Sequence, residues 1–148
     1  APKPVAIVEI DAIRALADAD QPVIAAGGGG IPVMEQGSHL KGASAVIEKD
    51  RAAGLLAKEL DADVLMFITG VSNVVLNYGS DHPINIDKMT TADAARYAEE
   101  GHFKTGSMLP KVESSIDFIN AGKGRRAIIT SLDGAKSALA GKGGTTIQ

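Results

Sequence analysis

Cysteine is absent from the 148-residue sequence, so neither a disulfide framework nor a thiolate-bound metal is available, in keeping with a reducing cytoplasm. An excess of basic residues is also lacking: the net charge is −3, without the basic surface that nucleic acid binding requires. No apolar run approaches the roughly 20 residues that cross a bilayer, and the N-terminus carries no charged and then apolar leader. We therefore expect a cytoplasmic protein that partners neither nucleic acid nor membrane.

The composition that is present is typical of a folded globular protein. Hydrophobic residues make up 45% of the chain and charged residues 22%, which excludes the disordered and fibrous classes. A chain of 148 residues fits one domain. We therefore expect residues 1–148 to form a single domain around one compact core.

Helical and strand-like apolar patterns alternate along the chain with short connections. They predict helices over residues 10–17, 50–62, 91–100, 110–119 and 132–140, and strands over residues 23–26, 63–69, 74–76, 126–130 and 145–147. Thr90 and Asp93 have the spacing of a capping box ahead of the third helix. The alternation predicts an α/β fold, a three-layer sandwich with a mostly parallel sheet.

Four consecutive glycines, Gly27, Gly28, Gly29 and Gly30, follow the predicted strand 23–26. Glycine lets backbone N–H groups approach an anion closely, and open α/β sheets bind ligands at the ends of their strands. The spacing matches neither a P-loop nor a dinucleotide fingerprint. The run is therefore a candidate phosphate or substrate loop, and the alternative is a flexible turn.

Two lysines occupy predicted helix starts. Lys49 precedes Asp50, and this pair could neutralise a transferring phosphoryl group while the acid holds the ammonium; the alternative is a helix cap by Asp50 beside a solvated lysine. Lys111 falls in the first turn of the helix that Pro110 opens, where the helix dipole disfavours a cation. A bound anion would remove that conflict, and the alternative is an ordinary exposed lysine.

The remaining candidate side chains carry weaker signals. His39, His82 and His102 lack metal-ligand spacing and fit no Ser-His-Asp arrangement, so we expect no metal site and no catalytic histidine. Tyr78 and Met108 could pack against a flat base, and the alternative is that they belong to the core.

Taken in order, the motifs of the chain resemble those of carbamate kinases, which are members of the amino-acid-kinase family. The matching segments are Gly-Gly-Gly-Gly-Ile-Pro-Val at 27–33, Val-Ile-Glu-Lys-Asp at 46–50, Asn-Tyr-Gly at 77–79, Glu-Gly-His-Phe at 100–103, Gly-Ser-Met at 106–108, Pro-Lys at 110–111 and Arg-Ala-Ile-Ile-Thr-Ser at 126–131. The resemblance covers essentially the whole chain. It implies the C-terminal portion of the amino-acid-kinase fold.

The resemblance also implies roles for individual residues. Lys49 matches the lysine that contacts the transferring phosphate, Asp50 the acid that organises the catalytic lysines, and Lys111 the lysine that holds the ATP phosphates. The residues implied around the nucleotide are Thr69, Gly70, Val71, Tyr78, Gly106 and Met108.

The function implied is reversible phosphoryl transfer between ATP and carbamate, with ATP or ADP bound together with Mg²⁺. This chain would be the ATP-binding half, inactive alone, and its partners would be the N-terminal half of the same protein and a second copy in a homodimer. The missing initiator Met is in keeping with a processed or truncated chain. Two alternatives stay open: another kinase of the same fold, or a non-catalytic nucleotide-binding or interaction module. The hypothesis of a non-catalytic module starts from Gly70 and Ser72, where many relatives carry acidic residues.

Overall fold

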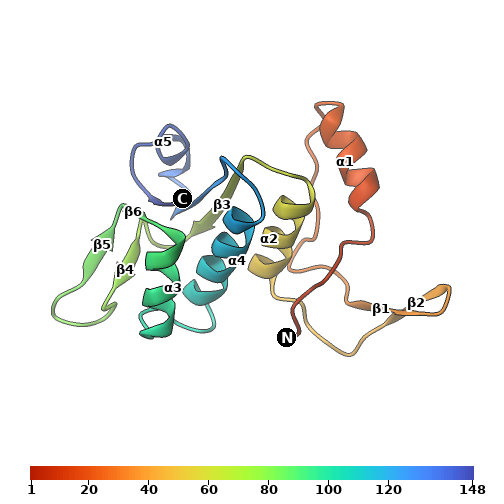
Figure 1. The fold of residues 1–148 in the computed structure, drawn as a ribbon, viewed down its shortest axis with the longest axis horizontal. Coiled ribbons are helices and arrows are strands. Elements are labelled where there is room, and N and C mark those ends of the chain that lie inside the picture. Colours follow the sequence, from red (N-terminus) through yellow and green to blue (C-terminus); the bar gives the residue numbers. More distant parts are fainter.

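The computed structural model describes all 148 residues, which form five helices and eight strands (Figure 1). In chain order these are α1 Ile10–Asp18, β1 Val33–Gln36, β2 His39–Gly42, α2 Lys49–Glu59, β3 Val64–Thr69, β4 Val74–Leu76, β5 Ile84–Ile86, β6 Lys88–Met89, α3 Thr91–Glu99, α4 Met108–Asn120, β7 Arg126–Ser131, α5 Ala135–Leu139 and β8 Thr145–Ile147. None of the helices has the length and apolar character needed to span a bilayer.

The central sheet has four strands in the order β3-β7-β8-β6. The pairs β3–β7 and β6–β8 are parallel, and only β7–β8 is antiparallel. The predicted, mostly parallel sheet is therefore confirmed. Thr69 pairs with Ser131, so the carboxyl ends of β3 and β7 lie side by side.

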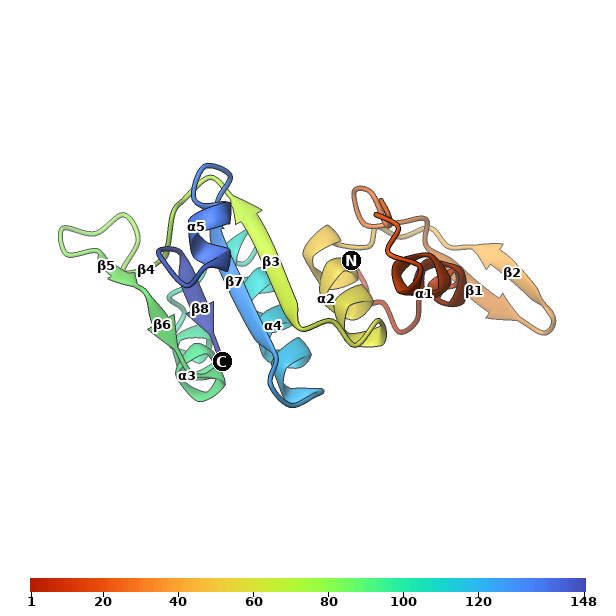
Figure 2. The same cartoon turned by 90° about the horizontal axis from the view of Figure 1, so that it is seen from above.

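Helices cover both faces of this sheet, as the three-layer prediction requires. Helices α2, α3 and α4 lie side by side on one face, and the short α5 lies on the other (Figures 1 and 2). Strand β7 is buried along its centre, because Ile128 and Ile129 alternate between the two faces and both are fully covered.

The hydrophobic core lies entirely in the C-terminal two-thirds of the chain. Its members fall between Ala57 and Ile147, and Phe118 and Val112 are fully buried at its centre. Val112 lies on the inner face of α4, and Ile116 and Ile119 of the same helix pack against the core as partly buried side chains. The helix predicted over residues 110–119 is therefore confirmed, although α4 begins two residues earlier, at Met108.

The capping box ahead of α3 forms as predicted. The hydroxyl of Thr90 accepts a hydrogen bond from the Asp93 N–H at 3.0 Å, and the Asp93 carboxylate accepts one from the Thr90 N–H at 3.2 Å. These two bonds satisfy N–H groups that the first turn of a helix otherwise leaves unpaired.

The strand predicted over residues 23–26 is wrong. No neighbouring strand pairs with this segment, and the Ile24 side chain is fully exposed. A strand needs a partner for its N–H and C=O groups, so an apolar run alone does not make one. The glycine run consequently follows an extended loop and not a sheet strand.

The β1–β2 hairpin, by contrast, was missed. Its two strands are joined by Gly37 and Ser38, and Gly37 has a φ of 61°. A two-residue turn that starts with glycine is a recognised hairpin signal, so the sequence did contain the information.

The first 47 residues pack loosely and expose much apolar surface. Only Ile13 and Gly29 among them are buried. Large exposed side chains of this region include Val5, Ile24 and Ile31. The α1 helix and the β1–β2 hairpin lie at one end of the molecule, and the β4–β5 hairpin lies at the other (Figure 2).

Candidate functional site

The two lysines singled out by the sequence meet at one edge of the sheet. Helix α2 leads into β3 and helix α4 leads into β7, so each helix runs back against its strand and starts near the strand's carboxyl end. Because Thr69 pairs with Ser131, these two carboxyl ends are neighbours. Lys49 and Lys111, at the starts of α2 and α4, are therefore brought to the same place.

Asp50 and Lys111 form a buried ion pair at this edge. The Lys111 ammonium donates to Asp50 Oδ2 at 2.6 Å, and both side chains are only 8% exposed. The Lys111 ammonium also lies 3.3 Å from the Ser107 carbonyl oxygen. An isolated charge would be costly at this depth, so each group depends on the other for its burial.

Lys49 lies beside this pair but faces solvent. Its side chain is 58% exposed, and its ammonium lies 3.1 Å from Glu48 Oε1 and 3.5 Å from Asp50 Oδ2. The hydrogen bond to Glu48 is the largest cause that raises the pKa of Lys49 above its ordinary value. Lys49 is thus a fixed positive charge that an incoming anion can reach.

Glu48 is a member of this cluster that sequence reasoning missed. Its Oε2 accepts hydrogen bonds from the N–H groups of Asp50 at 2.8 Å and Arg51 at 3.0 Å, so Glu48 caps α2. Partial burial alone would raise the pKa of Glu48, but the hydrogen bonds from Arg51 and Lys49 outweigh it and lower that pKa. The alternative that Asp50 is the cap is wrong. Glutamate is not among the favoured capping residues, so no local rule pointed to it.

The four charged groups of the cluster cancel. Lys49 and Lys111 supply two positive charges, and Glu48 and Asp50 supply two negative ones. A multiply charged anion such as a polyphosphate would meet two well-placed ammonium groups, yet it would need further positive charge from elsewhere. The arrangement can orient a phosphoryl group but cannot neutralise it alone.

The glycine run lies against the start of α2. A Cβ at Gly29 would be 1.9 Å from the Ile47 carbonyl oxygen and 3.4 Å from the Lys49 backbone nitrogen, and Gly29 has a φ of 137°. Only glycine fits there. At Gly27 and Gly28 a Cβ would meet nothing within 4 Å. The structure therefore brings the run next to the lysine cluster, and close backbone packing explains one of its glycines.

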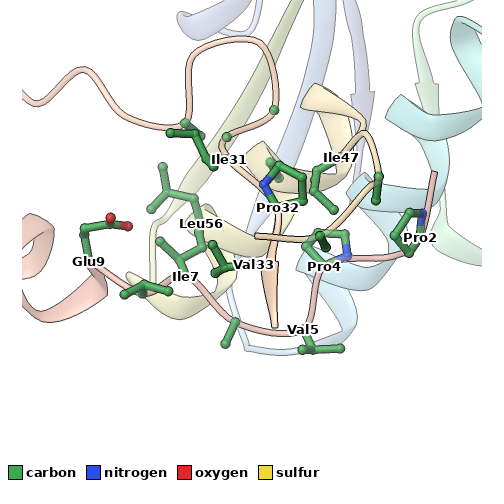
Figure 3. Close-up of a pocket in the computed structure, with 18 of the residues that line it drawn as sticks. Pro2, Pro4, Val5, Ile7, Glu9, Ile31, Pro32, Val33, Ile47 and Leu56 are labelled. Carbon is green, nitrogen blue, oxygen red and sulfur yellow. The ribbon is translucent and has the colours of Figure 1, made fainter. Parts of the chain in front are cut away.

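Gly28, Gly29 and Gly30 also line a large open cavity of about 1240 Å³ (Figure 3). Its walls are mostly apolar and come chiefly from residues 2–9, 24–26, 28–34 and 43–45 and from α2, as Ile7, Ile31, Val33, Ile47 and Leu56 in Figure 3 illustrate. Lys49, Asp50 and Lys111 do not line it. The cavity suits apolar surface and not a phosphate group.

The predicted nucleotide residues are divided between two places. Thr69 ends β3, and Gly70 and Val71 follow it at the edge where the lysines meet. Gly106 and Met108 lead into α4 at that same edge, and Met108 packs partly against the core.

Tyr78 lies apart from these residues. It occupies the turn between β4 and β5, and its side chain is 76% exposed. The tip of that hairpin projects from the end of the molecule away from α2 (Figure 2). The structure does not bring Tyr78 to the lysine cluster.

The histidines lie in separate places, His39 in β2, His82 in the β4–β5 turn and His102 after α3. No group of three or more His, Asp or Glu side chains is arranged to hold a metal ion. A metal at this edge would therefore need most of its ligands from a bound molecule.

Known proteins resemble the chain in both sequence and structure. A family model for the amino acid kinase family matches residues 1–131. Carbamate kinase-like protein YqeA from Escherichia coli (strain K12) is 51% identical over 146 residues, which span 99% of this chain and 47% of the relative. The carbamate kinase of Halobacterium salinarum is 47% identical, again over 99% of this chain and 47% of its own length.

Among solved structures, a carbamate kinase from Giardia lamblia bound to AMP-PNP superposes with a TM-score of 0.96 at 41% identity, covering 99% of this chain and 46% of that one. The chain thus spans about half the length of the curated relatives it matches. The predicted amino-acid-kinase fold is confirmed.

Proposed function

This chain belongs to the amino acid kinase family, and from that premise we propose that the protein containing it transfers a phosphoryl group between ATP and carbamate. The products are ADP and carbamoyl phosphate, and the reaction is reversible. The observation that carries the proposal is the meeting of Lys49, Asp50 and Lys111 at one sheet edge, in a chain 47% identical to a carbamate kinase. The absence of cysteine suits a cytoplasmic enzyme.

In this proposal the chain's own residues position phosphate and offset its charge. Lys49 contacts the transferring phosphoryl group with its exposed ammonium. Lys111, held by Asp50 at 2.6 Å, engages the ATP phosphates. Phosphoryl transfer needs mainly positioning and charge stabilisation from a protein, which fixed ammonium groups supply.

The remaining positive charge comes with the nucleotide. The lysine cluster has no net charge, and no three His, Asp or Glu side chains are grouped so that they could hold a metal ion. Mg²⁺ commonly binds through substrate phosphates and one or two carboxylates, and when bound it neutralises phosphate charge. We therefore infer that Mg²⁺ enters with ATP.

The nucleotide lies over the carboxyl ends of β3 and β7, against Thr69, Gly70, Val71, Gly106 and Met108. Open α/β sheets commonly bind ligands at such an edge. The AMP-PNP bound to the Giardia lamblia relative supports nucleotide binding. The glycine run 27–30 forms the substrate or phosphate loop where Gly29 lies beside the Lys49 backbone, and the apolar cavity that the run also lines takes protein and not phosphate. Tyr78 contacts the nucleotide only if the β4–β5 hairpin folds inward.

The partner of this chain is the N-terminal half of the same protein. Residues 1–47 expose large apolar side chains around the cavity, and the relatives are about twice as long as the part matched. The other half covers this apolar face. We therefore infer that the chain alone binds nucleotide without turnover. The homodimer that the family resemblance implies is proposed for the complete enzyme.

A substitution at Lys49 tests the proposal. In the full-length protein, Lys49→Ala abolishes carbamoyl phosphate formation and leaves the fold intact. Lys58→Ala is the matched control, because Lys58 is an exposed lysine in the last turn of the same helix. Near-normal turnover by Lys49→Ala would contradict the proposed carbamate kinase activity.

A second candidate is a nucleotide-binding module without catalysis, favoured by Gly70 and Ser72 in place of acids. Titration calorimetry with AMP-PNP and turnover of the full-length protein separate the two. Binding with turnover favours the carbamate kinase, binding without turnover favours the module, and no binding contradicts both. Turnover on an amino-acid carboxylate or a nucleoside monophosphate would indicate another kinase of the family.

A further inference from the structure

Glu48 occupies a place in the lysine cluster that the proposed chemistry leaves without a role. One carboxylate oxygen accepts from the Asp50 and Arg51 N–H groups, and the other accepts from the Lys49 ammonium. A carboxylate that accepts from two backbone N–H groups is held in orientation by the helix itself. Glu48 therefore presents a rigid anchor to the side chain of Lys49.

Lys49 needs such an anchor. It is the first residue of α2, where the helix dipole disfavours a cation, and its long side chain is 58% exposed. A free lysine side chain samples many rotamers, and restricting it costs entropy. Without a partner, its ammonium would not stay in one position.

Asp50 is poorly placed to supply this anchor. Its Oδ2 already accepts from Lys111 at 2.6 Å, and the same oxygen lies 3.5 Å from the Lys49 ammonium, at the limit of a hydrogen bond. The Glu48 contact is the shorter of the two, at 3.1 Å. The two carboxylates thus divide the two lysines between them.

We propose that Glu48 is a positioning residue that holds the Lys49 ammonium where it meets the transferring phosphoryl group, while Asp50 serves Lys111. The inference rests on the proposed role of Lys49. It assigns to Glu48 half of the task that family resemblance gives to Asp50 alone.

Whether nucleotide binding becomes weaker or tighter when the Glu48 charge is removed separates a positioning role from a purely electrostatic one. Removing the Glu48 charge takes a negative group away from bound phosphates, which by itself strengthens nucleotide binding. Removing it also releases Lys49, which weakens binding. If positioning dominates, the loss exceeds the gain, because hydrogen bonds to charged groups are among the stronger ones.

The experiment compares Glu48→Gln with Glu113→Gln in the 148-residue chain. The amide that replaces the Glu48 carboxylate keeps an oxygen that can cap α2, so the helix is retained. Glu113 pairs with Arg51 at 2.8 Å, so its substitution removes a charge from the same helix pair without touching Lys49. Titration with AMP-PNP and Mg²⁺ should show roughly tenfold weaker binding for Glu48→Gln. Glu113→Gln should stay within about twofold of the unsubstituted chain.

An NMR titration of the Lys49 side chain gives a readout that a purely structural role would not move. Glu48→Gln should lower the Lys49 titration midpoint toward that of an ordinary lysine, and Glu113→Gln should leave it unchanged. Tighter or equal AMP-PNP binding by Glu48→Gln, or an unchanged Lys49 midpoint, would overturn the proposal.

The two arms also distinguish this inference from the proposed function. If the unsubstituted chain binds no AMP-PNP while Glu48→Gln still lowers the Lys49 midpoint, the anchoring of Lys49 stands and the nucleotide function fails. If the chain binds AMP-PNP but Glu48→Gln changes neither readout, the nucleotide function stands and the role of Glu48 fails.

Discussion

The buried ion pair between Asp50 and Lys111 can be broken by replacing either residue. We expect the two substitutions to lower the free energy of unfolding by different amounts. Both side chains are 8% exposed and lie 2.6 Å apart. Asp50→Ala leaves the Lys111 ammonium with one carbonyl, that of Ser107 at 3.3 Å. Lys111→Met leaves the Asp50 carboxylate with a second cation, Lys49, at 3.5 Å. The unpaired ammonium is therefore the worse outcome.

The magnitudes follow from burial and remaining partners. Removing one partner of a buried pair typically costs about 3–5 kcal/mol, and we expect Asp50→Ala to fall in that range. Lys111→Met should cost roughly 1–3 kcal/mol, because the remaining carboxylate keeps a charged neighbour. The double substitution should cost at least about 1 kcal/mol less than the sum, since it leaves no buried charge unpaired.

Urea unfolding of the 148-residue chain, followed by circular dichroism, measures these free energies. Asp117→Ala is the control: Asp117 lies on the same helix α4 but pairs with Lys3 at the surface, so its loss should cost no more than about 1 kcal/mol. Additive single substitutions, or an Asp50→Ala cost no larger than that of Lys111→Met, would refute the reasoning.

Three further predictions concern the helices. A Cβ at Gly54 would lie 2.7 Å from Ser114 Cβ across the α2–α4 contact. Gly54→Ala should therefore lower the free energy of unfolding by about 1–2 kcal/mol, although alanine has the better helix propensity, and Ser114→Gly in the same chain should recover part of the loss. A Gly54→Ala chain that is more stable than the unsubstituted one would contradict this. Thr90→Ala removes the α3 cap and should cost about 1 kcal/mol in the same assay, whereas Thr91→Ala, one residue on, should be nearly neutral. Because the pKa of Glu48 is lowered, its carboxylate stabilises the fold at pH values above the ordinary pKa near 4.5, and this contribution is lost as the pH falls through the lowered pKa. The difference in unfolding free energy between the unsubstituted chain and Glu48→Gln should therefore shrink on acidification. A difference that stays constant from pH 7 to 3 would exclude this contribution.

Local patterns in the sequence predicted most of the core elements. Continuous apolar runs identified β3 and β7 within one residue of their bounds, and the capping residues Thr90 and Asp93 identified the start of α3. These features depend on residues a few positions apart, which is the range over which propensity and periodicity act. The strand predicted over residues 23–26 failed because a distant pairing partner decides that outcome, whereas the β1–β2 hairpin was missed although its turn signal at Gly37 is local.

The candidate site shows the same division. Lys49, Asp50 and Lys111 were singled out from their residue types and predicted helix positions, and the resemblance implied roles for them that stay predictions. The resemblance implied that Asp50 organises the lysines, but the local patterns gave no contact between them: Asp50 meets Lys111 across 61 residues because α2 and α4 pack side by side. Glu48 caps α2 in the ordinary extended N-cap conformation, although glutamate is not among the residues favoured at that position.

What the sequence by itself determined is the fold class, the family and the chemistry that is available, because apolar periodicity and the order of motifs lie along the chain. The tertiary structure alone decided which charges neutralise one another, which glycine is needed for close packing, and that an apolar segment stays without a strand partner. Those outcomes depend on distances between residues far apart in sequence, and only the packing of helices against the sheet sets such distances.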